Sequence, residues 1–480
     1  MNDKNPRPSV LSRLVTVFLW SMFILSVGSI AAFHYNRGSE GNFEGIFRIN
    51  SLTLIIWATV TFFSAVVSTY SSKYLIGFHY YNRFIGLSLG FTSSVCLFVF
   101  ADHVSLLLLA WFAMGFFMSR LIGVDARWGE AREAARYCQR YFTFGGLLLA
   151  AGILLLCFYT NQYTLTGLSG QLHNLPYPVL LTSALCIITA AAIQSAMFPF
   201  HRWLLSAMTS PTPASALMHA GFVNAAGILL TLLAPLFYLS DTMTLLIIIG
   251  GITAIVAQFA KLIQVNIKQK LGCSTVAQMA FMIMQCGLGF FNAAVVHLIL
   301  HGFYKAYLFL SSGEEIEHIS PRKRRTSQLN YAEAILVCVL GLLGAFLFAT
   351  ITGKGVKMDG GIFLTLIVAI TVGQAMDNII KQPGLSRLKK ATIGPVIFLI
   401  SIGLYALMYN GVSGFMNDMP MIEHPEPLSV LQIVFGVIFL IGFFIMKLGV
   451  YEGFSWLYVK LVNDSQPYRK TVLRYKKSSK

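Results

Sequence analysis

Hydrophobic residues along this chain fall into runs of about 18–22 residues, and short polar segments separate the runs. A helix of about 20 apolar residues, with a rise of roughly 1.5 Å per residue, crosses the ~30 Å hydrocarbon core of a bilayer. The pattern therefore predicts an all-α polytopic membrane protein with about 14 transmembrane helices. The expected helices cover residues 11–33, 51–70, 84–101, 103–122, 141–160, 179–199, 213–238, 242–260, 273–290, 293–313, 331–350, 361–380, 391–410 and 428–459.

The composition agrees with this pattern. The chain has 480 residues, of which 56% are hydrophobic and 11% charged, whereas soluble globular proteins have ~25% charged residues. No polar segment is long enough for a soluble catalytic domain, so we expect a transport protein and not an enzyme. The first run has too long an apolar core for a typical signal peptide, and we expect it to stay as a helix. The seven cysteines are scattered without a CxxC or His/Cys cluster, so we expect no metal site or cofactor in this chain.

The net charge of +16 is distributed unevenly between the polar segments. Alternate segments, beginning with the N-terminal tail, hold 28 of the 35 lysines and arginines, and the other set holds 4. Cytoplasmic loops carry such an excess, so both termini are predicted to lie in the cytoplasm. The basic residues therefore indicate orientation and not a surface that binds nucleic acid. With Arg13 counted in the N-terminal tail, the remaining basic residues inside expected helices are Arg120, Lys305 and Lys447.

Three ionisable residues lie inside the expected helix 293–313, namely His297, His301 and Lys305. Their spacing of four places them on one helix face, as a ladder about 12 Å long. A charged residue near the middle of a membrane helix costs on the order of 2.5–3.5 kcal/mol, so such residues normally face protein or water. A titratable ladder of this kind is what a proton relay requires. In the other interpretation, the histidines form interhelical hydrogen bonds and Lys305 extends to the interface.

Prolines interrupt the segment 190–230. Pro199 removes a backbone donor and is expected to end the helix that precedes it, and Pro211 and Pro213 lie in the following turn. His219 lies about two turns into the next helix. A broken helix beside a buried histidine can expose backbone dipoles to an ion path. Breaks of this kind also occur as plain packing features, and the pattern alone leaves both interpretations open.

Other polar segments suggest contacts on the cytoplasmic side. Residues 123–140 hold arginines and glutamates at helical spacing, which predicts a short surface helix. This helix either faces solvent or docks a partner protein. The loop 261–272 is a second candidate for the docking surface. The tail 463–480 is basic and is expected to be mobile, or ordered only against a partner or anionic lipid. Asp377 lies within a turn of Lys381, which favours a terminal salt bridge, although it stays a candidate for the ion path with Lys447.

Three segments resemble the signature of the antiporter-like membrane subunits found in respiratory complex I, Mrp antiporters and DAB inorganic carbon pumps. They read FPFHRWLLSAMTSPTPASALMHA, NIKQKLGCSTVAQMAFM and HLILHGFYKAYLFLSSG. The resemblance implies discontinuous helices and two inverted five-helix repeats around a polar axis. It implies scaffold helices in 1–100, the repeats in 101–240 and 241–410, and a C-terminal helix with a basic tail in 411–480.

The resemblance also assigns roles to individual residues. His297, His301 and Lys305 match the relay ladder of the family, and His219 matches the histidine that follows the proline-rich loop. Lys354 matches the lysine of the second broken helix, although no proline-containing break is recognisable there.

The chain departs from the family pattern at one ion pair. Trp111-Phe112 stands where the family has Trp-Glu, and Gln194-Ser195-Ala196 stands where it has Lys-Ser-Ala. Losing both partners together avoids a lone buried charge. Gln194 therefore remains a candidate for the ion path, and Arg120 is expected to replace part of the missing charge.

These departures make the chain most similar to the membrane subunit (DabB-type) of DAB carbon pumps, in a bacterial inner membrane. The resemblance implies a large cytoplasmic DabA-type partner that binds zinc and resembles a carbonic anhydrase, with the flow of H⁺ or Na⁺ driving hydration of CO₂. The alternatives are an Mrp-type antiporter or complex I-like pumping subunit, and a structural anchor whose ion path has decayed.

Overall fold

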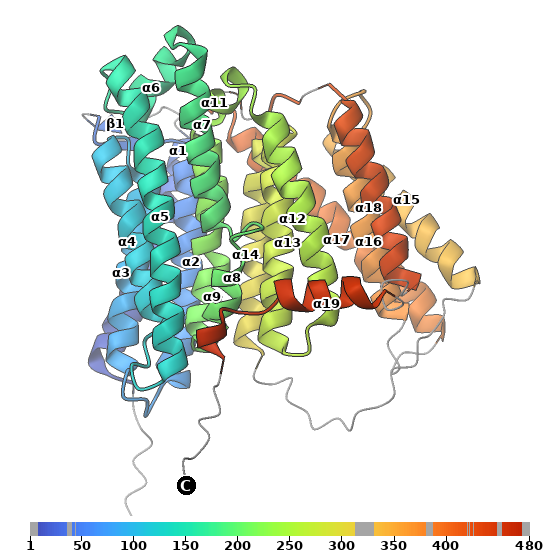
Figure 1. Cartoon of the computed structure of the whole chain (residues 1–480), viewed down its shortest axis with the longest axis horizontal. Coiled ribbons are helices and arrows are strands. Elements are labelled where there is room, and N and C mark those ends of the chain that lie inside the picture. The colour runs from blue at the N-terminus through green and yellow to red at the C-terminus, as the bar shows by residue number, and fades with distance from the viewer. Residues whose placement is uncertain are drawn as a thin grey trace, which may run out of the picture.

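The computed structural model of the chain describes residues 8–35, 41–43, 45–312, 331–380, 387–419, 421, 423–425, 427–448 and 454–472. Its long helices run roughly parallel in one broad layered bundle, and the only sheet among the described residues is a two-stranded hairpin (Figure 1). Ten helices of the described part are long and apolar enough to cross a membrane. The polytopic α-helical fold is thus confirmed, while the number 14 stays a prediction.

The N-terminal part forms one side of the bundle. Its elements are α1 (Val10–Tyr35), β1 (Gly41–Phe43), β2 (Phe47–Ile49), α2 (Ser51–Tyr74), α3 (Tyr81–Phe100) and α4 (Val104–Ile122). Helix α2 begins with a capping box, in which the Asn50 side chain accepts from the Thr53 amide and the Thr53 hydroxyl accepts from the Asn50 amide. The apolar faces of α1 to α4 pack together, so these helices support the central elements that follow.

The middle of the chain contains the broken segment. Its elements are α5 (Gly129–Thr160), α6 (Leu165–Gln171), η1 (Leu172–Asn174), α7 (Tyr177–Gln194), α8 (Arg202–Ser206), η2 (Ala207–Thr209), α9 (Thr212–Ala220), η3 (Phe222–Asn224), α10 (Ala225–Leu232) and α11 (Ala234–Leu239). The expectation of a short surface helix before residue 141 is wrong. Helix α5 is continuous over 32 residues and about 48 Å long. It is therefore longer than a ~30 Å hydrocarbon core, and its N-terminal turns, which hold the arginines, extend beyond that core.

The C-terminal half forms the other side of the bundle. Its elements are α12 (Met243–Ile263), α13 (Ile267–Gly287), α14 (Phe291–Leu310), α15 (Tyr331–Thr352), α16 (Gly361–Ile380), α17 (Arg387–Phe415), α18 (Val430–Leu448), α19 (Ser455–Asp464) and η5 (Arg469–Thr471). The expected domain boundaries after residues 100 and 240 fall between helices, whereas the boundary after residue 410 falls inside α17. The two inverted repeats stay a prediction.

The expected helix 428–459 does not exist as one element. Helix α18 ends at Leu448, and α19 runs across one end of the bundle, at a steep angle to the long helices (Figure 1). We call this end the basic face, since Arg202 donates there to the carbonyl of Asn463 in α19 and the Lys268 Nζ donates to the Ser210 carbonyl just before α9. The expectation that the tail is mobile is also wrong for residues 463–472, because the chain itself supplies their docking surface.

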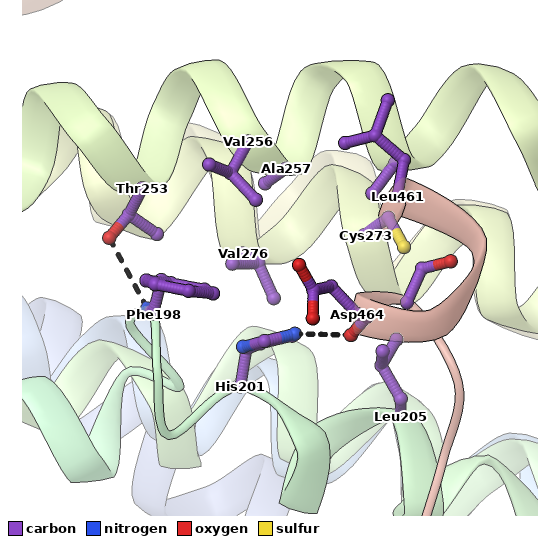
Figure 2. Close-up of a pocket in the computed structure, with 12 residues that line it drawn as sticks. Phe198, His201, Leu205, Thr253, Val256, Ala257, Cys273, Val276, Leu461 and Asp464 are labelled. Carbon is purple, nitrogen blue, oxygen red and sulfur yellow. Dashed lines mark hydrogen bonds between the residues drawn. The ribbon is translucent and has the colours of Figure 1, made fainter. Parts of the chain in front are cut away.

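Contacts from the turn before α8 hold this C-terminal segment. The His201 Nε2 and the carbonyl oxygen of Asp464 are 2.7 Å apart, and Nε2 is the donor because a carbonyl oxygen only accepts. These two residues and Leu461 line a pocket (Figure 2). Beyond α19, the Tyr468 amide donates to Ser206 Oγ over 2.8 Å, and the Tyr468 ring stacks on Tyr137 of α5 at 4.3 Å. Segments more than 260 residues apart in sequence are thereby joined at the basic face.

Docking of the C-terminal segment is expected to weaken at low pH. Burial lowers the pKa of His201 from its ordinary value of 6.5, the Arg202 guanidinium lowers it further, and the carbonyl and carboxylate of Asp464 oppose this. The docked state therefore binds fewer protons than the undocked state, so docking is strongest above about pH 6.5 and weakens as the pH falls below it. Hydrogen exchange of residues 455–470, corrected for the intrinsic rate, should be faster at pH 5.5 than at pH 7.5. In His201→Gln, which keeps a donor but does not titrate, the difference should vanish; equal protection at both pH values in the wild type would contradict this account.

Candidate functional site

Helix α14 carries the ladder through the interior of the bundle. His297 is 8% exposed, His301 is 4% exposed and Lys305 is 0% exposed. The imidazole rings of His297 and His301 are nearly parallel, with centroids 6.2 Å apart. The structure therefore places all three side chains on one buried face of α14, as the spacing of four residues predicts. The interpretation in which Lys305 extends to the interface does not fit, since its side chain is fully buried.

The Lys305 ammonium contacts a helix backbone. Its Nζ donates to the carbonyl of Leu271 in α13 over 3.0 Å. No carboxylate forms an ion pair with it among the described residues. A buried ammonium without an anionic partner has a high electrostatic energy, and loss of its proton relieves that energy. Lys305 is therefore a residue at which a proton can be stored or released.

The second element of the site is the break between α9 and α10. Helix α9 ends at Ala220, and the 3-10 turn η3 follows it, in which the Asn224 amide donates to the Gly221 carbonyl and the Ala225 amide donates to the Phe222 carbonyl. The Gln194 amide donates to the Phe222 carbonyl over 3.3 Å, and the Ser195 hydroxyl donates to the Val223 carbonyl over 2.8 Å. Gln194 thus stabilises the break from the C-terminal end of α7. The helix ends at Gln194 and not at Pro199, so the sequence misplaced the end of this helix.

The break lies directly against the ladder helix. The Asn224 amide donates to the Leu298 carbonyl of α14 over 3.2 Å. Gly302 of α14 allows this approach, because a Cβ there would lie 2.5 Å from the Phe63 ring and 3.3 Å from the Ala220 carbonyl. The His219 ring stacks on the Phe309 ring, with centroids 4.3 Å apart and an 11° angle between planes. The structure therefore brings His219 beside the Lys305 end of the ladder.

The histidines of the site have polar atoms that the protein leaves unpaired. Both ring nitrogens of His219 and of His301, and Nε2 of His297, have no hydrogen-bond partner among the described residues. Buried polar atoms are almost always hydrogen-bonded, and ordered water is the usual partner where protein supplies none. Water is therefore the expected partner of these ring nitrogens. The interpretation in which the ladder histidines form interhelical hydrogen bonds does not fit His301.

A cavity of about 520 Å³ reaches the two ladder histidines. It lies between α12, α13 and α14 on one side and α16, α17 and α18 on the other, and Lys261, Gln258, Tyr405, His297 and His301 are among its lining residues. The volume is sufficient for a chain of water molecules. Lys261 lies in the last turn of α12, next to the basic face. The cavity thus extends from the two ladder histidines toward the basic face.

A polar cluster lies at the opposite end of α14. Lys354 follows α15 and forms an ion pair with Glu423, which also accepts from the Asn292 amide at the start of α14. Tyr409 of α17 completes the cluster, with its hydroxyl 3.3 Å from Glu423 Oε2. The sequence indicated Lys354 but missed Glu423, Asn292 and Tyr409. The only signal in the sequence was that the polar segment 417–428 is acidic, unlike the basic segments of the chain. Composition alone does not show what this segment contacts.

The remaining candidates have different environments. Arg120 is exposed, and its guanidinium lies over the Phe116 ring at 5.1 Å, so the expectation that it supplies charge to the first repeat is wrong. The Phe112 ring occupies the space above Gly146 of α5, where a Cβ would lie 2.5 Å from it. Asp377 and Lys447 fall outside the residues whose side chains the structure describes.

No group of three or more His, Cys, Asp or Glu side chains in the described ranges could hold a metal ion.

Comparison with known proteins places the chain in a family. Residues 101–380 match the family described as NADH:quinone oxidoreductase/Mrp antiporter, transmembrane. This range contains the broken helix, the ladder and Lys354. The chain belongs to this antiporter-like family.

Its relatives include carbon transporter and quinone oxidoreductase subunits. The "probable inorganic carbon transporter subunit DabB" of Bacillus anthracis is 32% identical over 355 residues, which cover 73% of this chain and 69% of the relative. The corresponding DabB1 of Halothiobacillus neapolitanus is 36% identical over 58% of this chain and 51% of its own length. The chloroplastic NAD(P)H-quinone oxidoreductase subunit 5 of Chaetosphaeridium globosum is 32% identical over 57% of this chain and 42% of its own length.

Solved structures show the same fold. A chain of the Mrp complex from Dietzia sp. superposes with a TM-score of 0.64 and 21% identity, over 94% of this antiporter-like chain and 56% of that one. A chain of the archaeal membrane-bound sulfane sulfur reductase superposes with a TM-score of 0.58 and 16% identity, over 96% and 93% of the two chains. At these identities the likeness concerns the fold alone.

Proposed function

We propose that this protein is the proton-translocating membrane subunit of an inorganic carbon transporter, with both termini in the cytoplasm of a bacterium and the bundle in its inner membrane. The observation that carries the proposal is the buried ladder on α14, in which His297 and His301 border a cavity and Lys305 is fully enclosed. Relatives named as inorganic carbon transporter subunits support the assignment to carbon transport. Conversion of CO₂ to bicarbonate belongs, in this proposal, to a separate subunit.

The chemistry of the ladder favours H⁺ over Na⁺. Imidazole and amine groups accept and donate protons, whereas hard metal cations prefer oxygen ligands. A positively charged Lys305 would also repel a sodium ion. In the proposed path a proton moves along His297 and His301 through bound water to Lys305, and His219 lies beside that end of the ladder. Gln194 holds the break open toward α14 without carrying a proton.

A cytoplasmic partner would use this flow. One charge that crosses a membrane potential of 100 mV releases about 2.3 kcal/mol, which biases a coupled reaction more than tenfold. We propose that a large zinc-binding subunit of the DabA type receives this energy at the basic face and hydrates CO₂ in one direction. The exposed arginines of α5, Arg132 and Arg136, face away from the bundle and offer a docking surface for it.

The alternative is an Mrp-type antiporter or complex I-like pumping subunit, which the fold of the Mrp complex makes reasonable. The uncharged Phe112 and Gln194 argue against it, because the resemblance implies a charged pair at these positions in such subunits. Purification of the native complex separates the two proposals. We expect a single large soluble subunit with bound zinc to accompany the chain, whereas an antiporter would bring several small membrane subunits.

Charge reversal tests the docking surface in the same experiment. In Arg132→Glu/Arg136→Glu the zinc recovered with the chain should fall at least about tenfold, because opposite charges across an interface favour association. Reversal of Arg120, which is also exposed but lies in α4, is the matched control and should leave recovery within about twofold. Full recovery of zinc with the double variant would reject this docking surface, and absence of zinc from the wild-type complex would reject the proposed partner.

A further inference from the structure

The segment between α17 and α18 is fixed onto the start of the ladder helix. Glu423 pairs with Phe290 in an antiparallel bridge, and the His424 amide donates to the Gly289 carbonyl over 3.0 Å. The Tyr238 hydroxyl donates to the His424 carbonyl over 2.8 Å. Gly289 has a φ of +83°, and a Cβ there would collide with the His424 carbonyl, so only glycine allows this approach. The backbone on both sides therefore sets the position of Glu423.

The Glu423 carboxylate is placed between charge and hydrogen-bond donors. Lys354 forms an ion pair with this carboxylate. The Lys354 side chain is 16% exposed and the Glu423 side chain is 29% exposed. Asn292, which is 1% exposed, donates to Glu423 and to Ser413 Oγ. The Tyr409 hydroxyl lies 3.3 Å from the carboxylate and 3.4 Å from Asn292 Oδ1. One side of this carboxylate thus meets solvent while the other meets buried polar groups.

Two helices connect this cluster with the ladder. On α14, Asn292 precedes His297 by five residues, which corresponds to about 7.5 Å along the helix axis. On α17, Tyr409 contacts Glu423 while Tyr405, one turn away and about 6 Å along the axis, lines the cavity that His297 borders. Polar groups therefore lie about one to two helix turns apart between the cavity and the partly exposed carboxylate of Glu423, at the end of the bundle opposite the basic face.

We propose that Glu423 is the outer proton-exchange group of this path, where protons enter from the side opposite the basic face. The Glu423 carboxylate takes a proton from external water and forms an O–H bond, which weakens its ion pair with Lys354. The proton then passes to water held near Tyr409 and Asn292, and from there to His297. The Lys354 ammonium draws the carboxylate back to its charged form, which readies it for the next proton. This inference rests on the proposed proton translocation.

The test compares Glu423 variants in the assembled complex in right-side-out membrane vesicles, where inward proton flux under an imposed potential is followed with a pH-sensitive dye. Glu423→Gln keeps the size and hydrogen-bonding capacity of the side chain but does not titrate, and should lower flux at least about tenfold. Glu423→Asp, which keeps the carboxylate, should restore flux to within about threefold of the wild type. Asp241→Asn removes an exposed carboxylate from the turn between α11 and α12, away from Lys354, and is the matched control, with flux within about twofold.

The outcomes separate this inference from the proposed function. Wild-type flux in Glu423→Gln, with flux lost in Lys305→Ala, would overturn the role of Glu423 and leave proton translocation intact. Wild-type flux in both variants would overturn proton translocation itself. Equal loss in Glu423→Asp and Glu423→Gln would assign Glu423 a structural role only. If Glu423→Gln does not accumulate in the membrane, Tyr409→Phe serves instead, and flux reduced about three- to tenfold supports the path whereas wild-type flux rejects it.

Discussion

Replacement of Lys305 by alanine is expected to lower proton flux and inorganic carbon uptake at least about 100-fold, in the range typical for loss of a proton-transfer group. The Lys305 side chain is fully buried, and its ammonium donates to one backbone carbonyl, that of Leu271. Alanine removes the group that would hold the proton between the histidines and the basic face. The complex should still assemble, because the change also removes an energetically costly buried charge and leaves a neutral cavity.

The measurement follows carbon uptake and proton flux together with the amount of complex in the membrane. Lys357→Ala is the matched control, since Lys357 is an exposed lysine between α15 and α16, and uptake should stay within about twofold of the wild type. Lys305→Met tests charge separately from volume and should be as inactive as alanine. Normal uptake in Lys305→Ala with normal assembly would reject the relay and favour a structural anchor.

Replacement of Gly250 by valine is expected to reduce the folded protein in the membrane to a small fraction of the wild-type amount. Helices α12 and α13 cross closely at this point. A Cβ at Gly250 would lie 2.6 Å from the Ala280 carbonyl oxygen and 2.9 Å from the Met284 amide nitrogen. Both neighbours are backbone atoms of a helix, which cannot move aside singly. Overpacking costs typically 1–3 kcal/mol, and we expect about 3 kcal/mol or more where backbone blocks the added methyl groups.

Membrane protein packing relies on small residues at such crossings, because lipid solvates apolar helices as well as a neighbouring helix does. The matched control is Gly403→Val in α17, since nothing lies within 4 Å of a Cβ at that position. Its yield and its thermal stability in detergent should stay near wild type. Equal yields of the two valine variants would show that the close crossing of α12 and α13 does not limit folding. Both helices line the cavity, so the crossing also sets the width of the proposed path.

Local properties of the chain determined the class of protein and the ladder. Run length predicts membrane helices because the bilayer fixes the distance that a helix must span. The spacing of His297, His301 and Lys305 fixes a common face because the helix period is 3.6 residues. The prolines predicted the break before His219, although α7 ends at Gln194, five residues earlier than expected. A helix end depends on which carbonyls and side chains meet there, and the sequence pattern does not contain that information.

Tertiary structure alone decided the contacts between distant segments. Glu423 is paired with Lys354, and Tyr468 with Tyr137, through loops that bring separated parts of the chain together. The tail 463–480 was expected to be mobile because its composition is basic and polar, yet residues 463–472 find a docking surface on their own chain. Periodicity describes how one element faces its surroundings, whereas the identity of those surroundings depends on how helices far apart in sequence pack. For that reason the sequence by itself determined the ladder, and only the packed structure revealed the carboxylate cluster beyond the start of α14.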